Sequence, residues 1–301
     1  MNQIEVTILS IIIMIAIGYF LKRIDFLSDK DIDSFNKVVM YIFLPCMVFH
    51  ALYTADLSGI STLGILPFVV LASSLITGTI SFLILKQFNL DDVTLWSVLV
   101  TVMIANTAVM GYPVTLGIFG NDGFLRAIFS DIATLITFLA LSFVLIVKFG
   151  GTVKTAVRKI VLFPSLWAVI LGLIFNLLNV PAVPVIDNTI NYLGQGAIPL
   201  IMLALGLSID FGALKRSRRM IAFTSVMKLA VFPLVAFFVA THIGLTGLDY
   251  KIPVVEAAMP SALMSLLLSI NYRLDFELTS DCILINTVIS LITLPAIIML
   301  F

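Results

Sequence analysis

Charged residues are scarce in this sequence. Only 11% of its 301 residues are Asp, Glu, Lys or Arg, less than half of the ~25% that soluble domains usually carry. Apolar residues make up 61%, and the mean hydropathy is +1.18. So few charges would not cover the surface of a soluble fold of this size, and the lipid bilayer is therefore the expected solvent. The basic and acidic residues balance at 17 each, which excludes a strongly basic nucleic-acid-binding body.

Cysteine and histidine are equally rare, with two residues of each type. Cys46 and Cys282 both lie inside apolar runs, so neither a disulfide framework nor the Cys/His spacing of a zinc site is present. The sequence also lacks a His-Glu-x-x-His helix, a Gly-x-Ser-x-Gly elbow and a glycine-rich nucleotide loop with its lysine. We therefore expect no enzyme activity, no organic cofactor and no resident catalytic metal.

Long apolar stretches are what the sequence has in abundance. A membrane-spanning helix needs about 20 mostly apolar residues. Ten stretches meet this need and follow each other almost without loops: 4–21, 38–55, 57–85, 93–121, 124–147, 160–186, 188–209, 220–241, 249–270 and 282–301. The sequence thus predicts an all-α integral membrane protein with ten transmembrane helices.

The basic residues predict how these helices are oriented. The connections after the first, third, fifth, seventh and ninth stretches hold fourteen Lys or Arg residues, whereas the opposite connections hold two, Arg126 and Lys251. Because basic loops stay in the cytoplasm, we expect a multi-pass protein of the cell membrane, in bacteria the inner membrane, with both termini outside.

Weak internal matches indicate a repeat. Gly18 and Gly172, Pro45 and Pro199, and Asp56 and Asp210 are each separated by 154 residues; Asp131 and Asp281 are 150 apart, and Pro113 and Pro260 are 147 apart. Their common order predicts two five-helix repeats, residues 1–150 and 151–301. Since five is odd, the second repeat would be inverted, which is typical of secondary transporters and less often of channels.

Two of the matched positions predict broken helices. Pro113 lacks an N–H group, and Gly111 tolerates backbone angles that other residues avoid, so the fourth helix should be interrupted there. Pro260 occupies the corresponding place in the ninth helix. Each proline would begin a half-helix whose positive end could receive an anion. Freed backbone groups are tolerated at membrane depth only where they line a cavity or contact protein, so the two breaks predict a shared polar crossing point.

Four ionisable residues lie at depth: Asp131, Lys228, Glu256 and Asp281. Charges at such positions are costly and usually functional or paired. Each carboxylate could bind a proton or a sodium ion, and Lys228 could attract an anionic substrate. Alternatively, Lys228 forms a structural ion pair with one carboxylate. Asn286 and Thr287 are uncharged groups that could ligate an ion or simply bridge helices.

Several sets of residues together resemble the auxin efflux carrier family, in particular its bacterial malate- and malonate-permease-like members. The most specific are Asn106-Thr107 with Gly111 and Pro113, and Ala257-Ala258-Met259-Pro260-Ser261. The resemblance implies a fold similar to those of sodium–bile acid symporters and sodium–proton antiporters, with helices 4 and 9 crossing at broken centres. It further implies a panel of helices 1, 2, 6 and 7, a scaffold of helices 3–5 and 8–10, and a substrate site formed by Asn106, Thr107, Met110, Gly111, Pro113, Ala258, Met259, Pro260 and Ser261.

The expected function is secondary active transport of a small organic anion such as malate, malonate or an auxin-like carboxylate. Coupling to H⁺ or Na⁺ is expected, with Asp131 or Asp281 as sodium positions. Partners are the substrate and the lipid bilayer, with no nucleic acid, and the apolar surface is compatible with a homodimer. The alternatives are a sodium-coupled carrier of a larger amphipathic anion such as a bile acid, and a passive anion channel or non-transporting membrane sensor.

Overall fold

The computed structural model describes residues 3–57, 60–151, 158, 161–209 and 218–301. Asp210 and the loop residues Lys154, Lys159, Lys215 and Arg216, on which part of the sequence argument rests, lie outside this described part. The chain forms two compact units. Unit 1 comprises Met1–Gly59, Leu116–Leu125 and Val157–Ile209, and unit 2 comprises Ile60–Thr115, Arg126–Ala156 and Asp210–Phe301.

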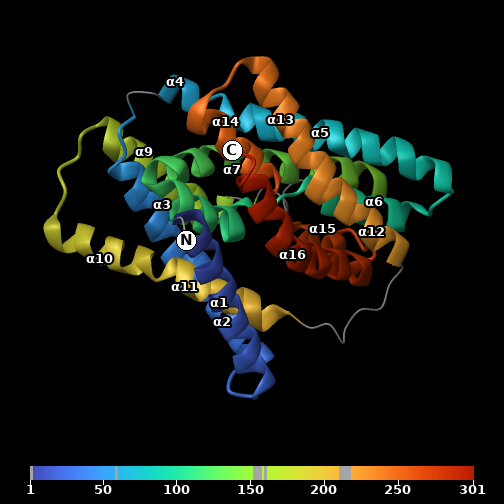
Figure 1. The fold of residues 1–301 in the computed structure, drawn as a ribbon, viewed down its shortest axis with the longest axis horizontal. Coiled ribbons are helices and arrows are strands. Elements are labelled where there is room, and N and C mark those ends of the chain that lie inside the picture. Colours follow the sequence, from blue (N-terminus) through green and yellow to red (C-terminus); the bar gives the residue numbers. More distant parts are fainter. Residues whose placement is uncertain (1–2, 58–59, 152–157, 159–160, 210–217) are drawn as a thin grey trace. The chain divides into compact units, whose positions relative to one another are not determined.

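Regular structure in the described residues is helical (Figure 1). Unit 1 contains α1 (Gln3–Arg23), α2 (Asp29–Val38), η1 (Val39–Phe43), α3 (Leu44–Tyr53), α9 (Pro164–Leu177), α10 (Pro184–Gln195) and α11 (Ala197–Ser208). Unit 2 contains α4 (Ile60–Leu63), α5 (Leu66–Leu85), η2 (Lys86–Phe88), α6 (Asp92–Met103), η3 (Thr107–Gly111), most of α7 (Tyr112–Phe149), α12 (Arg218–Val226), η5 (Met227–Val231), α13 (Phe232–Ile243), α14 (Gly247–Ala257), α15 (Met264–Asn271) and α16 (Phe276–Ile298).

Seven helical segments in the described residues are long and apolar enough to span a membrane, and α6 and α9 are shorter apolar helices. The all-α membrane architecture predicted from the sequence is therefore confirmed. The count of ten spans and their inverted repeat remain predictions.

Close backbone contacts hold unit 1 together. α1 packs along α11, and α3 packs along α9. At the first contact, a Cβ atom on Gly18 would overlap the carbonyl of Leu203, and one on Gly206 would overlap the carbonyl of Ile15. At the second, Asn176 Nδ2 lies 3.0 Å from the carbonyl oxygen of Leu52. The side-chain amide of Asn176 thus donates a hydrogen bond to a backbone carbonyl at the end of α3, where carbonyls lack partners within the helix.

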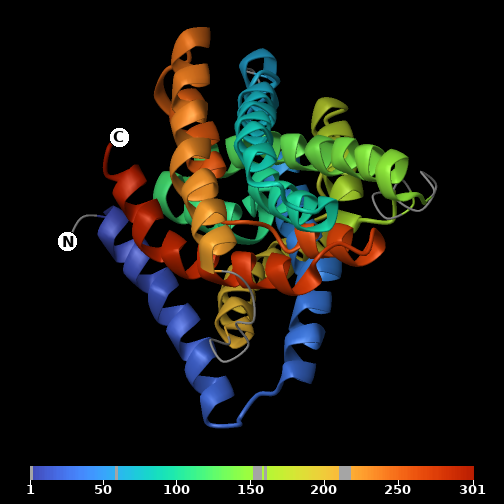
Figure 2. The same cartoon turned by 90° about the vertical axis from the view of Figure 1, so that its right-hand side faces the viewer.

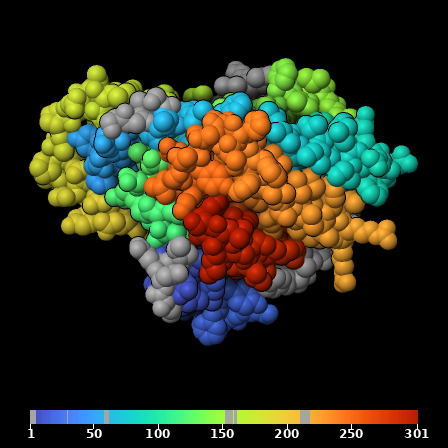
Figure 3. Space-filling model, turned by 45° about the horizontal axis from the view of Figure 1, so that its top comes forward, coloured from blue at the N-terminus to red at the C-terminus, as the bar shows by residue number. Residues whose placement is uncertain are grey.

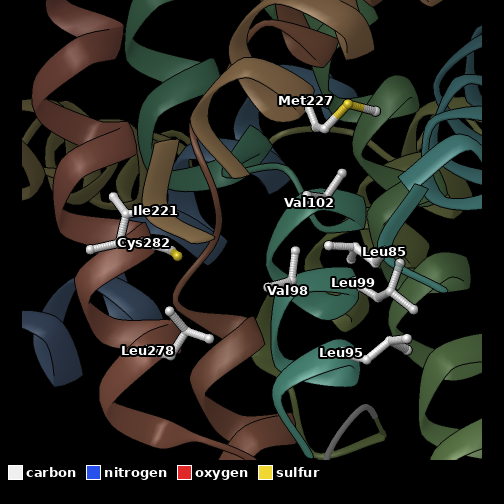
Figure 4. Packing of buried hydrophobic residues seen from close by; sticks show 9 residues of the cluster. All are labelled: Leu85, Leu95, Val98, Leu99, Val102, Ile221, Met227, Leu278 and Cys282. Carbon is white, nitrogen blue, oxygen red and sulfur yellow. The ribbon is translucent and has the colours of Figure 1, made fainter. Parts of the chain in front are cut away.

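Unit 2 is built around an apolar cluster (Figure 4). Its members are Leu85, Leu95, Val98, Leu99, Val102, Ile221, Met227, Leu278 and Cys282. They come from α5, α6, α12, η5 and α16, so four helices and a π turn share one core. α13 and α5 also lie side by side (Figure 2). The thiol of Cys282 is buried in this cluster and also donates to the hydroxyl of Thr224 at 3.5 Å.

Three π turns precede prolines at the same spacing. η1 ends at Phe43 before Pro45, η3 ends at Gly111 before Pro113, and η5 ends at Val231 before Pro233. A proline cannot donate the usual i→i−4 hydrogen bond, so the chain widens by one residue just ahead of it. At each turn the residue before the proline donates its N–H five residues back. These prolines therefore widen the helix ahead of them without breaking it.

Helix α7 bends sharply at Gly120. Together with η3 it forms a 43-residue apolar segment, which would measure about 65 Å if straight, roughly twice the hydrocarbon thickness. Gly120 has φ 66° and ψ −163°, a conformation that only glycine adopts readily. The bend separates a short arm, which continues η3, from the long arm that ends at Phe149.

The outer face of α13 and α14 is a continuous surface in Figure 3. Elsewhere on α13, the side chains of Leu234, Phe237 and Phe238 are exposed. Large apolar side chains exposed in this way suit contact with lipid tails rather than with water.

Candidate functional site

Two breaks in the helices of unit 2 pair with each other. The first is Ile104–Asn106, between α6 and η3, and the second is residues 258–263, between α14 and α15. We call this pair of segments the crossing. Ala105 and Ser261 form an antiparallel bridge. The N–H of Asn106 donates to the carbonyl of Pro260 at 2.8 Å, and the N–H of Ala262 donates to the carbonyl of Ile104 at 3.0 Å. Each break thereby satisfies backbone groups that the other frees, as membrane depth demands.

The sequence correctly predicted two helix breaks that meet, but it did not predict their positions correctly. Gly111 has ordinary helical angles, φ −63° and ψ −46°, so it does not interrupt the helix. The prediction that Pro113 and Pro260 begin half-helices was wrong. The first half-helix begins at Thr107 and the second at Met264, because backbone groups in the two breaks pair with each other instead of continuing their helices.

All nine residues expected to form a substrate site are buried in unit 2. Asn106, Pro260 and Ser261 belong to the crossing itself. Thr107, Met110 and Gly111 form η3, whose last two N–H groups both donate to the carbonyl of Asn106 at 3.2 Å. Pro113 follows in the first turn of α7, and Ala258 and Met259 complete the second break. Their role in binding remains a prediction.

Beside η3 lies a group of residues that we call the acid cluster: Asp131, Glu256, Thr107, Tyr112 and Thr134. The hydroxyl of Thr107 donates to Oδ1 of Asp131, and the hydroxyl of Tyr112 donates to Oδ2 at 3.0 Å. Thr107 and Thr134 share a hydrogen bond at 3.0 Å. Each carboxyl oxygen of Asp131 thus accepts one hydroxyl hydrogen bond.

Glu256 completes the acid cluster from α14. Its side chain is 0% exposed, and none of the described residues makes a hydrogen bond with either carboxyl oxygen. Its carboxyl group packs directly against Gly111, where an added Cβ atom would overlap both oxygens. Gly111 is therefore needed for space beside Glu256 rather than for backbone freedom.

Asn286 of α16 links the crossing to α12. Its Nδ2 donates to the hydroxyl of Ser261 at 2.8 Å, and its Oδ1 accepts from Ser225 at 2.6 Å. All three side chains are buried. The amide thus bridges helices, as one of the two alternatives for this residue predicted.

Three further candidates are Lys228, Asp281 and Thr287. Lys228 is 0% exposed, and its Nζ has no hydrogen-bond partner among the described residues. It lies 3.7 Å from the ring centroid of Phe232, and the described residues show no ion pair of Lys228 with a carboxylate, which was the structural alternative to a functional role. Asp281 and Thr287 are buried in α16.

The sequence did not identify Tyr112, Thr134 and Ser225 as site residues. Tyr112 lies in the Gly111-Tyr112-Pro113 motif, which could have drawn attention to it. Single hydroxyls such as Thr134 and Ser225 occur throughout the apolar stretches and carry no signal of their own.

Unit 1 contains a cavity of about 560 Å³ between α3, α10 and the bend of α7. Its polar lining includes Thr54, Asp56, Asn121, Asp122, Asn191 and Gln195. His50 also lines it, and its Nδ1 lies 3.2 Å from Oδ1 of Asp187, outside good hydrogen-bond geometry. Such a lining can hydrogen-bond a small polar molecule.

Known proteins resemble the chain over nearly its whole length. The family described as "Membrane transport protein" matches residues 4–298. An uncharacterized transporter of Methanothermobacter thermautotrophicus is 37% identical, covering 96% of this chain and 95% of the relative. An uncharacterized transporter of Methanocaldococcus jannaschii is 33% identical over 95% of both. Auxin efflux carrier component 8 of Arabidopsis thaliana is 26% identical over 48% of this chain and 41% of its own length.

The family match and these relatives agree with the apolar helices and with the resemblance drawn from the sequence. The chain belongs to the auxin efflux carrier family of membrane transport proteins.

Proposed function

We propose that this transporter is a secondary carrier of a small organic anion, of the malate or malonate type, that works by alternating access. The observation that carries the proposal is the crossing, where two broken helices exchange backbone hydrogen bonds. Broken helices that meet at the midplane are the usual substrate sites of secondary transporters. The chain would move its substrate past the crossing as unit 1 and unit 2 change their relative position.

The proposed architecture is ten membrane-spanning segments in two inverted repeats. The two arms of α7 on either side of Gly120 would belong to different spans, and α14 with α15 would form one broken span. Symmetric close contacts support the repeat. Gly18 packs on the Leu203 backbone of α11, and its repeat partner Gly172 packs on the Phe49 backbone of α3. The excess of basic residues in alternate connections supports a cytoplasmic location for those loops and outside termini.

The anionic substrate is supported by the half-helix that begins at Thr107, because the N-terminal end of a helix carries partial positive charge. The acid cluster opposes this attraction with two carboxyl groups. An anion would therefore enter more easily together with a cation, and we propose coupling to an H⁺ or Na⁺ gradient.

The test is uptake of labelled malate into proteoliposomes, with pH, sodium and voltage gradients imposed one at a time. The variant Pro113→Ala combined with Pro260→Ala should reduce initial uptake at least about tenfold at equal protein content. Pro295→Ala is the matched control, because it removes a proline inside α16 away from the crossing. Equal uptake by both variants would contradict a functional crossing.

A further inference from the structure

Glu256 is buried without a hydrogen-bonding partner among the residues that the structure describes. An ionised carboxylate in such a place loses its hydration and gains nothing in return, so the neutral acid is strongly favoured there. Glu256 differs in this respect from Asp131, whose oxygens accept two hydroxyl hydrogen bonds. The two acids of the cluster are thus in unlike environments, which is how proteins separate the proton affinities of neighbouring carboxyl groups.

The charged and titratable groups around Glu256 can be followed element by element. From α7, Asp131 and Tyr112 interact with it electrostatically. The packed helix α5 and the turn η3 contain no titratable residue. The other groups are Arg126 of α7, which forms an ion pair with Asp249 of α14 at 2.6 Å, His242 near the end of α13, Glu277, Asp281 and Cys282 on α16, and Tyr250 and Lys251 in the first turns of α14. Asp131 is therefore the acid whose charge Glu256 experiences directly.

The space beside Glu256 suits a proton better than a metal ion. On one side its carboxyl group already packs against Gly111, leaving no room for an added methyl group. The nearby hydroxyls of Thr107 and Tyr112 point their hydrogens at Asp131. A sodium ion would need several oxygen atoms arranged around it, whereas a proton needs a single carboxyl oxygen.

We infer that Glu256 is the proton carrier of the transport cycle, binding one proton from water on one side of the membrane and releasing it to water on the other. This inference rests on the proposed anion transport. Protonation of Glu256 removes one negative charge from the acid cluster, so the anion binds more tightly. By linkage, the bound anion raises the affinity of Glu256 for the proton to the same degree. Anion and proton therefore travel in the same direction.

The experiment combines a substrate-free readout with a transport readout on the same purified protein. Infrared difference spectra across a pH titration report the carbonyl stretch of a protonated carboxylic acid. We expect wild type to show this band at neutral pH, Glu256→Gln to lose it, and Glu277→Gln to keep it. In proteoliposomes, an outside pH one unit below the inside should drive about tenfold accumulation of labelled malate. Glu256→Gln should respond less than about twofold, Glu277→Gln should respond fully, and a sodium gradient should have no effect.

The two readouts separate the proton site from the carrier function. A band that persists in Glu256→Gln, or uptake by that variant that still follows pH, overturns the proton assignment and leaves the carrier standing. A sodium gradient that drives uptake also overturns it. If wild type shows the carbonyl band, and Glu256→Gln loses it, but wild type takes up no malate, the proton site is supported and malate is excluded as the substrate. Should Glu256→Gln fail to fold, Gly111→Ala presses on the same carboxyl group and should shift the pH at which the band disappears. An unshifted midpoint would contradict the assignment.

Discussion

Replacing Gly111 by alanine tests the contact between η3 and Glu256. Gly111 has helical backbone angles, so alanine would ordinarily stabilise this position by about 1 kcal/mol. Here the new Cβ atom would overlap both carboxyl oxygens of Glu256. Overpacking a tight interior costs about 1–3 kcal/mol, so the net effect should be a loss of about 1 kcal/mol in the free energy of unfolding. Unfolding of the purified protein in mixed micelles, followed by tryptophan fluorescence, measures this loss.

A double-mutant cycle isolates the contact. In a Glu256→Ala background the obstructing carboxyl group is gone, and Gly111→Ala should then stabilise by up to about 1 kcal/mol. The coupling energy between the two positions should therefore be about 2 kcal/mol. An equal effect of Gly111→Ala in both backgrounds would refute the reasoning, because the glycine would then serve something other than the space beside Glu256.

Three further substitutions probe separate features of unit 2. Asn286→Leu removes the donor to the buried hydroxyl of Ser261 and one of the two acceptors of Ser225, which keeps the carbonyl of Ile221, and should cost about 1–3 kcal/mol in the same unfolding assay; a loss below about 0.5 kcal/mol would contradict the bridging role. Lys228→Met removes a buried amine that has no hydrogen-bond partner among the described residues and should leave the melting temperature equal or higher; a fall of several degrees would show that the amine is paired. Asp91→Ala removes the N-cap of α6 and should cost about 1 kcal/mol near neutral pH. Because the N–H and hydroxyl of Thr94 donate to Asp91, the pKa of this carboxyl is lowered. Its contribution is present above the ordinary pKa of aspartate, about 3.9, and disappears as the pH falls through the lowered value. The difference between wild type and variant should therefore vanish in strong acid, and a difference that persists there would contradict this origin.

The sequence predicted the kind of site better than its position. Pro113 and Pro260 correctly indicated two interrupted helices that meet. The first break nevertheless lies at Ile104–Asn106, a segment without proline or glycine. Its backbone leaves the helix because Ile104 and Asn106 form hydrogen bonds with residues of the opposite break. A pairing between residues far apart in the chain leaves no local signal, so reasoning from local breakers misplaced the half-helix starts by several residues.

The acid cluster shows the same limit. The sequence correctly placed Asp131 and Glu256 inside the apolar stretches and therefore identified them as candidates. It left open whether Lys228 attracts an anion or pairs with a carboxylate, and the amine lies over Phe232, four residues further along the same helical segment. A single sequence shows which ionisable residues lie inside apolar stretches. It does not show which side chain each of them contacts, because that depends on how the helices are rotated about their axes.

Counterflow of malate tests the central claim, that this family member is a carrier, most directly. Proteoliposomes containing the wild-type protein are loaded with unlabelled malate and diluted into a trace of labelled malate without any imposed gradient. A carrier exchanges internal unlabelled malate for external labelled malate. We therefore predict a transient accumulation of labelled malate above its equilibrium level, which liposomes without protein do not show. Label that rises only to equilibrium would indicate a channel, and label that does not enter at all would contradict malate transport by this protein.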